Sequence, residues 1–160
     1  MTGSKDIWRR ALVLAVAGGL GFWLANFAIS LTPIAAEYRA ALSIAYLPML
    51  LESLLGGLII GFCVSYTLLR LFDRIPTQNP ILKSVILSFI VLVIVTILLQ
   101  SPAAFLAASD VLRYFLIGTM FNLFRILALG IVTGYLYKRL YRDFNASAIA
   151  PEPARVEVSE

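Results

Sequence analysis

Four polar residues stand inside stretches of sequence that are otherwise apolar, and they are the residues best able to do chemistry: Glu52, Arg125, Asn26 and Asn122. Ionisable groups are costly in hydrocarbon, so in membrane proteins they are functional candidates by default. A carboxylate such as that of Glu52 can exchange a proton or a cation. An arginine such as Arg125 can hold an anionic group or a lipid headgroup.

Helical spacing predicts that these residues lie on two inward faces. The residues of one face follow one another in steps of four, three, four and four: Gly118, Asn122, Arg125, Leu129 and Thr133. The residues of the other face have the same spacing: Glu52, Gly56, Ile59, Cys63 and Thr67. We therefore expect both faces to point into the protein.

The depths of these residues decide which of them can meet. Glu52 and Asn26 lie at matching depth, so we expect them to approach each other. Glu52 and Arg125 differ by roughly 10 Å along the membrane normal, so a direct salt bridge stays open. Three interpretations follow: internal hydrogen bonds that join the helices, a contact with a partner subunit, or a polar path for a transported solute.

Several kinds of site lack their usual residues. The chain has no histidine and a single cysteine, Cys63, so the common ligands for a zinc or iron–sulfur site are missing. No glycine-rich phosphate-binding motif is present. No serine has a base nearby in a recognisable arrangement. We expect neither an enzyme nor a protein with a metal or another cofactor.

Composition indicates an integral membrane protein. Of 160 residues, 61% are hydrophobic and 14% are charged, and the mean hydropathy is +0.91. Four segments have the roughly 20 apolar residues that span a bilayer: 11–31, 48–69, 81–100 and 114–137. The sequence predicts an all-α bundle of four transmembrane helices within residues 1–144. Residues 145–160 are predicted to form a disordered cytoplasmic tail.

The distribution of basic residues predicts the orientation. One side of the membrane would carry ten: Lys5, Arg9, Arg10, Arg70, Arg74, Lys83, Lys138, Arg139, Arg142 and Arg155. The other side would carry only Arg39 and Arg113. The positive-inside rule then puts both termini in the cytoplasm of a multi-pass protein of the inner or plasma membrane. The net charge of +4 reflects this anchoring, so no nucleic-acid partner is expected.

Small residues predict which helices pack closely in lipid. They recur four apart in three of the segments: Ala17, Gly21 and Ala25; Gly57 and Gly61; Gly130 and Gly134. We therefore expect segments 11–31, 48–69 and 114–137 to form the tight core. Segment 81–100 has no glycine, and Ser84 and Ser88 give it only a weak packing edge, so it should be the most lipid-exposed.

The connection 32–47 is unusually apolar, and two forms of it stay open. It can be a short helix on the outer interface, or it can continue the flanking helices. Three small-residue faces exceed what four helices need, which favours a homo-oligomer or a membrane-protein partner. The lipid bilayer is the other expected partner. We expect the chain to be an accessory subunit that acts through helix–helix contacts. The alternative is a small transporter or channel that uses Glu52 and Arg125.

Overall fold

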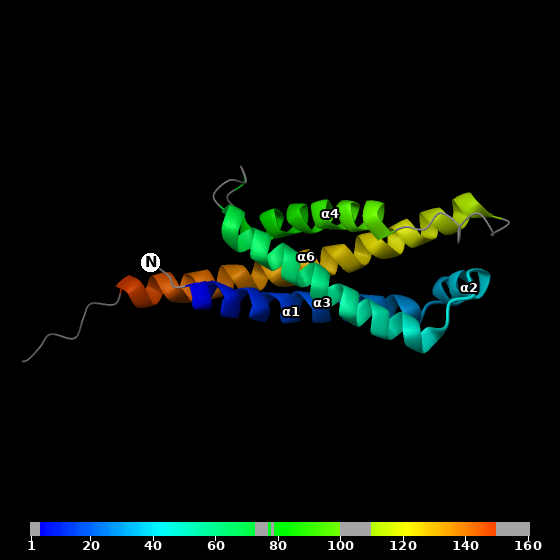
Figure 1. The fold of residues 1–160 in the computed structure, drawn as a ribbon, viewed down its shortest axis with the longest axis horizontal. Coiled ribbons are helices and arrows are strands. Elements are labelled where there is room, and N and C mark those ends of the chain that lie inside the picture. Colours follow the sequence, from blue (N-terminus) through cyan, green and yellow to red (C-terminus); the bar gives the residue numbers. More distant parts are fainter. Residues whose placement is uncertain (1–3, 73–76, 78, 100–109, 150–160) are drawn as a thin grey trace, which may run out of the picture.

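Helices make up all the regular structure of the described residues. The computed structural model describes residues 4–72, 77, 79–99 and 110–149, and side chains within 7–72, 77, 79–94 and 110–140. Its five helices are α1 (Ser4–Ser30), α2 (Pro33–Ala41), α3 (Tyr46–Leu71), α4 (Pro80–Leu99) and α6 (Val111–Ile149) (Figure 1). Three stretches are long and apolar enough to cross a membrane: Ile7–Ser30, Tyr46–Leu71 and Val111–Leu140.

Each predicted apolar segment lies within or along one helix, but the ends differ. α6 continues to Ile149, so the prediction of a disordered tail is wrong for residues 145–149. The sequence has no glycine or proline between Gly134 and Pro151, so nothing in it breaks the helix earlier. Residues 150–160 of that tail lie outside the described residues, as does the connection 102–109.

The connection after α1 is a separate helix, α2, which decides between the two forms that the sequence left open. Thr32 caps it, because its Oγ1 accepts a hydrogen bond from the Ala35 amide, and Pro33 follows at the first turn. Ser43 ends it in the left-handed conformation, with φ of 54°. The chain then turns into α3 beside α1.

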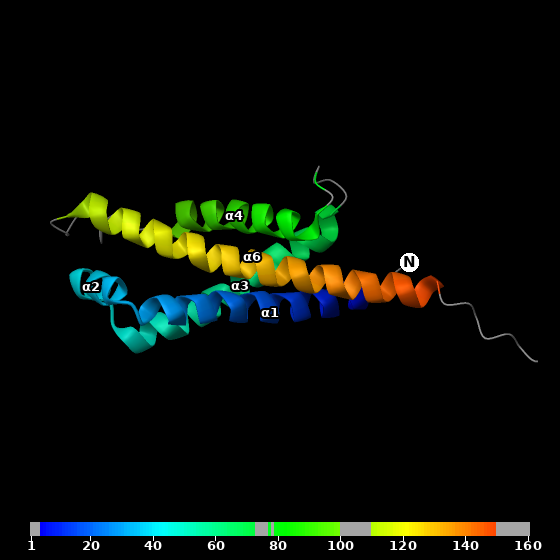
Figure 2. The same ribbon diagram turned by 180° about the vertical axis from the view of Figure 1, so that it is seen from behind.

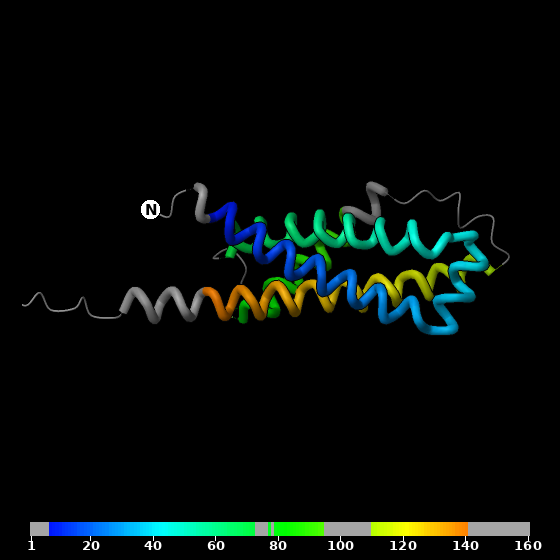
Figure 3. Tube along the Cα trace, turned by 90° about the horizontal axis from the view of Figure 1, so that it is seen from below, coloured from blue at the N-terminus to red at the C-terminus, as the bar shows by residue number. Residues whose placement is uncertain are grey.

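α1 lies between α3 and α6, which hardly touch each other (Figure 3). Gly57 and Gly61 bring α3 against α1, as the sequence predicts. A Cβ atom at Gly61 would lie 2.7 Å from the Ala15 carbonyl oxygen. A Cβ atom at Gly57 would lie 3.0 Å from the carbonyl oxygen of Gly19. The helix backbones therefore touch, and only glycine fits between them.

The opposite side of α1 packs on α6. A Cβ atom at Gly21 would lie 3.0 Å from Val132, and Gly18 faces the buried Thr133. Ala17 and Ala25, the other small residues of the predicted stripe, are half-buried. α1 thus uses small residues toward both of its neighbours.

Gly130 and Gly134 do not face the core that the sequence predicts. They face α4, where Cβ atoms would lie 2.9 Å from Val85 Cα and 2.6 Å from Ile81 Cα. Ser84 and Ser88 of α4 are fully buried in this contact. The prediction of a weakly packed third segment is therefore wrong. Serine is small enough to let two backbones approach, and Ser88 satisfies its hydroxyl on its own helix by donating to the Ser84 carbonyl.

The two ends of the bundle differ in character. The start of α1 and the end of α6 lie at one end, and α2 lies at the other (Figures 1 and 2). At the first end the buried Lys83 of α4 donates to the carbonyl of Phe72, the residue directly after α3, and its Nζ lies 3.7 Å from the centre of the Phe72 ring. A lysine there donates to a carbonyl at the C-terminal end of the helix, a position that favours a positive charge.

Candidate functional site

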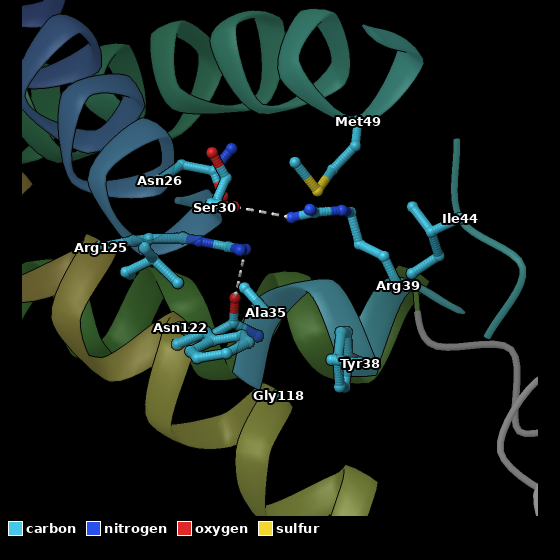
Figure 4. A pocket seen from close by; sticks show the side chains of 12 residues that line it. Asn26, Ser30, Ala35, Tyr38, Arg39, Ile44, Met49, Gly118, Asn122 and Arg125 are labelled. Carbon is cyan, nitrogen blue, oxygen red and sulfur yellow. Dashed lines mark hydrogen bonds between the residues drawn. The ribbon is translucent and has the colours of Figure 1, made fainter. Parts of the chain in front are cut away.

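A pocket of about 180 Å³ lies between α1, α2 and α6, near the α2 end of the bundle (Figure 4). Helix ends and a loop contribute to it as well as helix faces. Its lining residues are Asn26, Ile29, Ser30, Ala35, Tyr38, Arg39, Ile44, Met49, Gly118, Phe121, Asn122 and Arg125. Three of the four polar residues singled out from the sequence are among them: Asn26, Asn122 and Arg125.

Arg125 enters the pocket from the middle of the Val111–Leu140 span of α6. Its Nη1 donates a hydrogen bond of 3.2 Å to Oδ1 of Asn122, one turn earlier in the same helix. Side chains on a helix lean toward its N-terminus, so Arg125 leans toward the end of the bundle that holds α2. Its Nε is buried and meets no hydrogen-bond partner within the described part of the chain.

A second arginine, Arg39 of α2, reaches into the same pocket from the other side (Figure 4). Its Nη1 donates a 3.1 Å hydrogen bond to the carbonyl of Ser30, at the C-terminal end of α1. Its guanidinium also lies 5.1 Å from the centre of the Tyr46 ring. These contacts leave other N–H groups of the guanidinium to face the pocket, since an arginine carries five.

Aromatic packing holds α2, and so Arg39, against α6. The Tyr38 ring meets Tyr114 and Phe121 edge-on, at 6.2 and 5.6 Å between ring centres. Gly118 makes room for it, because a Cβ atom there would lie 2.7 Å from the Tyr38 hydroxyl. Burial raises the pKa of Tyr38, against the opposing effect of the Arg125 charge. A tyrosine hydroxyl is protonated at neutral pH even at its ordinary pKa, so the Tyr38 hydroxyl can donate to a ligand in the pocket.

A salt bridge lies on the surface beside this packing. Arg113 of α6 pairs with Glu37 of α2 at 2.8 Å, and both side chains are about half exposed. Neither residue lines the pocket.

Asn26 does not meet Glu52, so that prediction is wrong. Its Nδ2 donates instead to Oγ of Ser53, the next residue along α3, at 2.8 Å. The prediction of matching depth holds, but Ser53 points about 100° away from Glu52 around the helix. Asn26 is 1% exposed, and its Oδ1 meets no partner in the described part of the chain.

The predicted inward face of α3 points outward. Glu52 and Cys63 are exposed, and Ile59 is 64% exposed. The buried face of α3 is the one that holds both packing glycines: Gly57, Ile60, Gly61, Val64, Ser65 and Leu68. This face is one residue step from the predicted one, so close packing of Gly57 and Gly61 turns Glu52 away from the core.

The predicted polar path from Glu52 to Arg125 therefore does not form. Asn26, Asn122 and Arg125 share the pocket, but Glu52 is absent from its lining. The predicted inward face of α6 is confirmed, since Asn122 and Arg125 line the pocket and Leu129 and Thr133 are fully buried. The lining holds two arginines and no carboxylate.

Arg39, Tyr38 and Ser30 were not among the sequence candidates. The available signal was that Arg39 and Glu37 are the only charged residues in the apolar connection 32–47. Among the described side chains, no three His, Cys, Asp or Glu residues gather closely enough to hold a metal ion. No protein-family model, curated protein or solved structure matches the chain.

Proposed function

We propose that the chain is a four-span protein of the inner or plasma membrane with both termini in the cytoplasm. The 20 apolar residues of α4 would supply the fourth span beside the three longer ones. An even number of spans agrees with the shared end at which α1 begins and α6 ends (Figure 1). The excess of lysine and arginine at that end supports a cytoplasmic orientation.

Within that membrane we propose an accessory subunit that binds another membrane protein through the outer face of α3. We define this face by Glu52, Gly56, Ile59 and Cys63. The observation that carries the proposal is the position of Glu52, an acid that lies exposed on a helix apolar enough to span the bilayer. No described side chain forms a salt bridge or hydrogen bond with Glu52. The residue lies about 9 Å along the helix axis from Tyr46, the first residue of α3.

A carboxylate on a lipid-facing surface costs up to about 2.5–3.5 kcal/mol at mid-span and less toward the helix ends, and a partner helix with a hydrogen-bond donor lowers that cost. Gly56 adds a place for close approach, since a Cβ atom there would meet nothing within 4 Å. A parallel second copy would bring two Glu52 carboxylates together, and like charges repel. The partner we propose is therefore a different protein, with a basic or amide side chain at the depth of Glu52.

Site-specific crosslinking in native membranes tests the proposal. A photoreactive residue at Ile59 lies on the outer face of α3, and one at Ile131 lies exposed on α6 as a control. We expect a discrete adduct from Ile59 alone, which Glu52→Leu abolishes and Glu37→Gln leaves unchanged. An adduct of twice the mass of the chain would mean that the partner is a second copy of this chain and not a different protein. Crosslinking that is equal at both positions, or absent at Ile59, would refute the proposal.

Transport through Glu52 and Arg125, the alternative function, has less support. The two residues lie on different surfaces, because Arg125 lines the pocket and Glu52 faces outward. A solute would have to leave the pocket to meet the carboxylate. The accessory role needs no such path, because Glu52 already lies on the outer face of α3 that would bind the partner.

A further inference from the structure

We infer that the pocket between α1, α2 and α6 binds a phosphate group. The first reason is charge. Arg39 and Arg125 enter one pocket, and no acidic residue lines it. The one acid of α2, Glu37, pairs with Arg113 outside the pocket. Two guanidinium groups that line one pocket repel each other, and an anion between them is attracted to both.

The second reason is the set of hydrogen-bonding groups. Arginine presents its donors in a planar fork that matches the oxygens of phosphate. The buried Nε of Arg125 meets no partner within the described residues, so its N–H group is available to a ligand. The Tyr38 hydroxyl and the Asn122 amide also line the pocket and add further donors. Inorganic phosphate can accept these hydrogen bonds with four oxygens, and a phosphodiester can accept them with two free and two ester oxygens, whereas a carboxylate has only two oxygens.

Among the buried side-chain acceptors of the lining, the Oδ1 of Asn26 is the one that meets no partner in the described part of the chain. The Asn26 amide is held in this orientation, because its Nδ2 donates to Ser53 and the Ser53 hydroxyl donates in turn to the Leu50 carbonyl. An acceptor among donors suits a ligand that carries a hydroxyl group. Hydrogenphosphate has one, and so does a phospholipid headgroup that ends in glycerol.

Size and position agree with this ligand. A cavity of about 150 Å³ accepts a molecule as large as benzene, so 180 Å³ accommodates a phosphate group. The pocket runs from Arg125, at the middle of the α6 span, to Arg39 on α2 beyond the end of α1. The apolar Ile29, Ile44 and Met49 also line it. A phosphate could therefore enter from solution or as the headgroup of an anionic lipid.

Two binding measurements on the full chain in mild detergent distinguish these sources. Equilibrium dialysis with radiolabelled inorganic phosphate tests the free ion. Native mass spectrometry after delipidation, with phosphatidylglycerol and phosphatidylcholine added in turn, tests the headgroup. We expect saturable binding of one ligand per chain in at least one measurement, with phosphatidylglycerol favoured over phosphatidylcholine. Absence of saturable binding in both would overturn the inference.

Variants assign the binding to the pocket. Arg39→Gln and Arg125→Gln should each weaken it by about 10-fold to 100-fold, because each removes charged hydrogen bonds. The matched control is Arg113→Gln, an arginine at the same end of the bundle but outside the pocket, which should bind as the unmodified chain does. Equal losses in all three variants would mean attraction to surface charge alone, and would also overturn the inference.

Two variants in α2 keep the test decisive if Arg125→Gln fails to fold. Tyr38→Phe and Arg39→Lys both lie outside the long spans and keep the size of the side chain nearly unchanged. Arg39→Lys keeps the charge but loses the fork, so it should weaken binding less than Arg39→Gln does. If Arg39→Gln and Tyr38→Phe both bind as tightly as the unmodified chain, the pocket is not the site.

Discussion

Two glycines of α3, Gly61 and Gly56, lie five residues apart and offer a matched test of the packing. A Cβ atom at Gly61 would lie 2.7 Å from the Ala15 carbonyl oxygen, which is backbone and cannot rotate away. A Cβ atom at Gly56 would meet nothing within 4 Å. We therefore predict that Gly61→Ala destabilises the protein relative to Gly56→Ala, although the chemical change is the same.

The magnitude follows from the geometry. Each substitution gains about 1 kcal/mol of helix propensity, so this gain cancels in the comparison. An ordinary contact at Gly61 requires α1 and α3 to separate by roughly 0.7 Å. A gap of this size forfeits about a quarter to a half of the dispersion energy of each contact that it opens. Overpacking of this kind costs about 1–3 kcal/mol, which is the difference in unfolding free energy that we expect.

Trp23 reports on this interface directly, because its Nε1 donates a 3.2 Å hydrogen bond from α1 to the Leu50 carbonyl of α3. In a Trp8→Phe background, Trp23 is the sole tryptophan of the chain. Unfolding of detergent-solubilised protein by sodium dodecyl sulfate, followed by its fluorescence, gives the two free energies. Equal unfolding free energies for the two alanine variants would show that the backbones of α1 and α3 do not touch at Gly61.

Three further substitutions have expected effects in the same unfolding assay. Lys83→Met should cost about 1–3 kcal/mol, because it removes the hydrogen bond that the buried lysine donates to the Phe72 carbonyl; no loss would show that this hydrogen bond does not stabilise the fold. Ser43→Gly should gain about 1 kcal/mol by relieving the left-handed backbone, whereas Ser43→Ala should not. Glu37→Gln should cost less than about 1 kcal/mol, since its pair with Arg113 is half exposed, and a larger loss would mean that the pair anchors α2.

The helices themselves could be predicted from the sequence, because an apolar stretch of about 20 residues has few other solutions in a membrane. The packing role of Gly57 and Gly61 could also be predicted, since glycine spaced by four is a strong signal of close approach. The signal from Ser84 and Ser88 was weaker, and so the contact of α4 with α6 was missed. A small polar residue allows the same approach as glycine, but it is also common on exposed helix surfaces.

The rotation of α3 could not be predicted, because two rules pointed to faces one residue apart. One rule put Glu52 inside as a polar residue that avoids lipid, and the other put Gly57 and Gly61 inside as packing residues. Helical spacing fixes which residues share a face, but it does not say which face turns inward. The backbone contact with α1 favours the glycine face and leaves Glu52 outside.

By itself, the sequence determined the helical class, the main apolar segments and the shared face of Asn122 and Arg125, since each depends only on composition or on spacing within one helix. The tertiary structure alone decided that Arg39 and Arg125 line one pocket. This arrangement depends on a short helix that folds back, and on aromatic contacts of Tyr38 with residues far along the chain. Local spacing carries no information about contacts between distant segments, so the charge of the pocket appears only when the helices have packed.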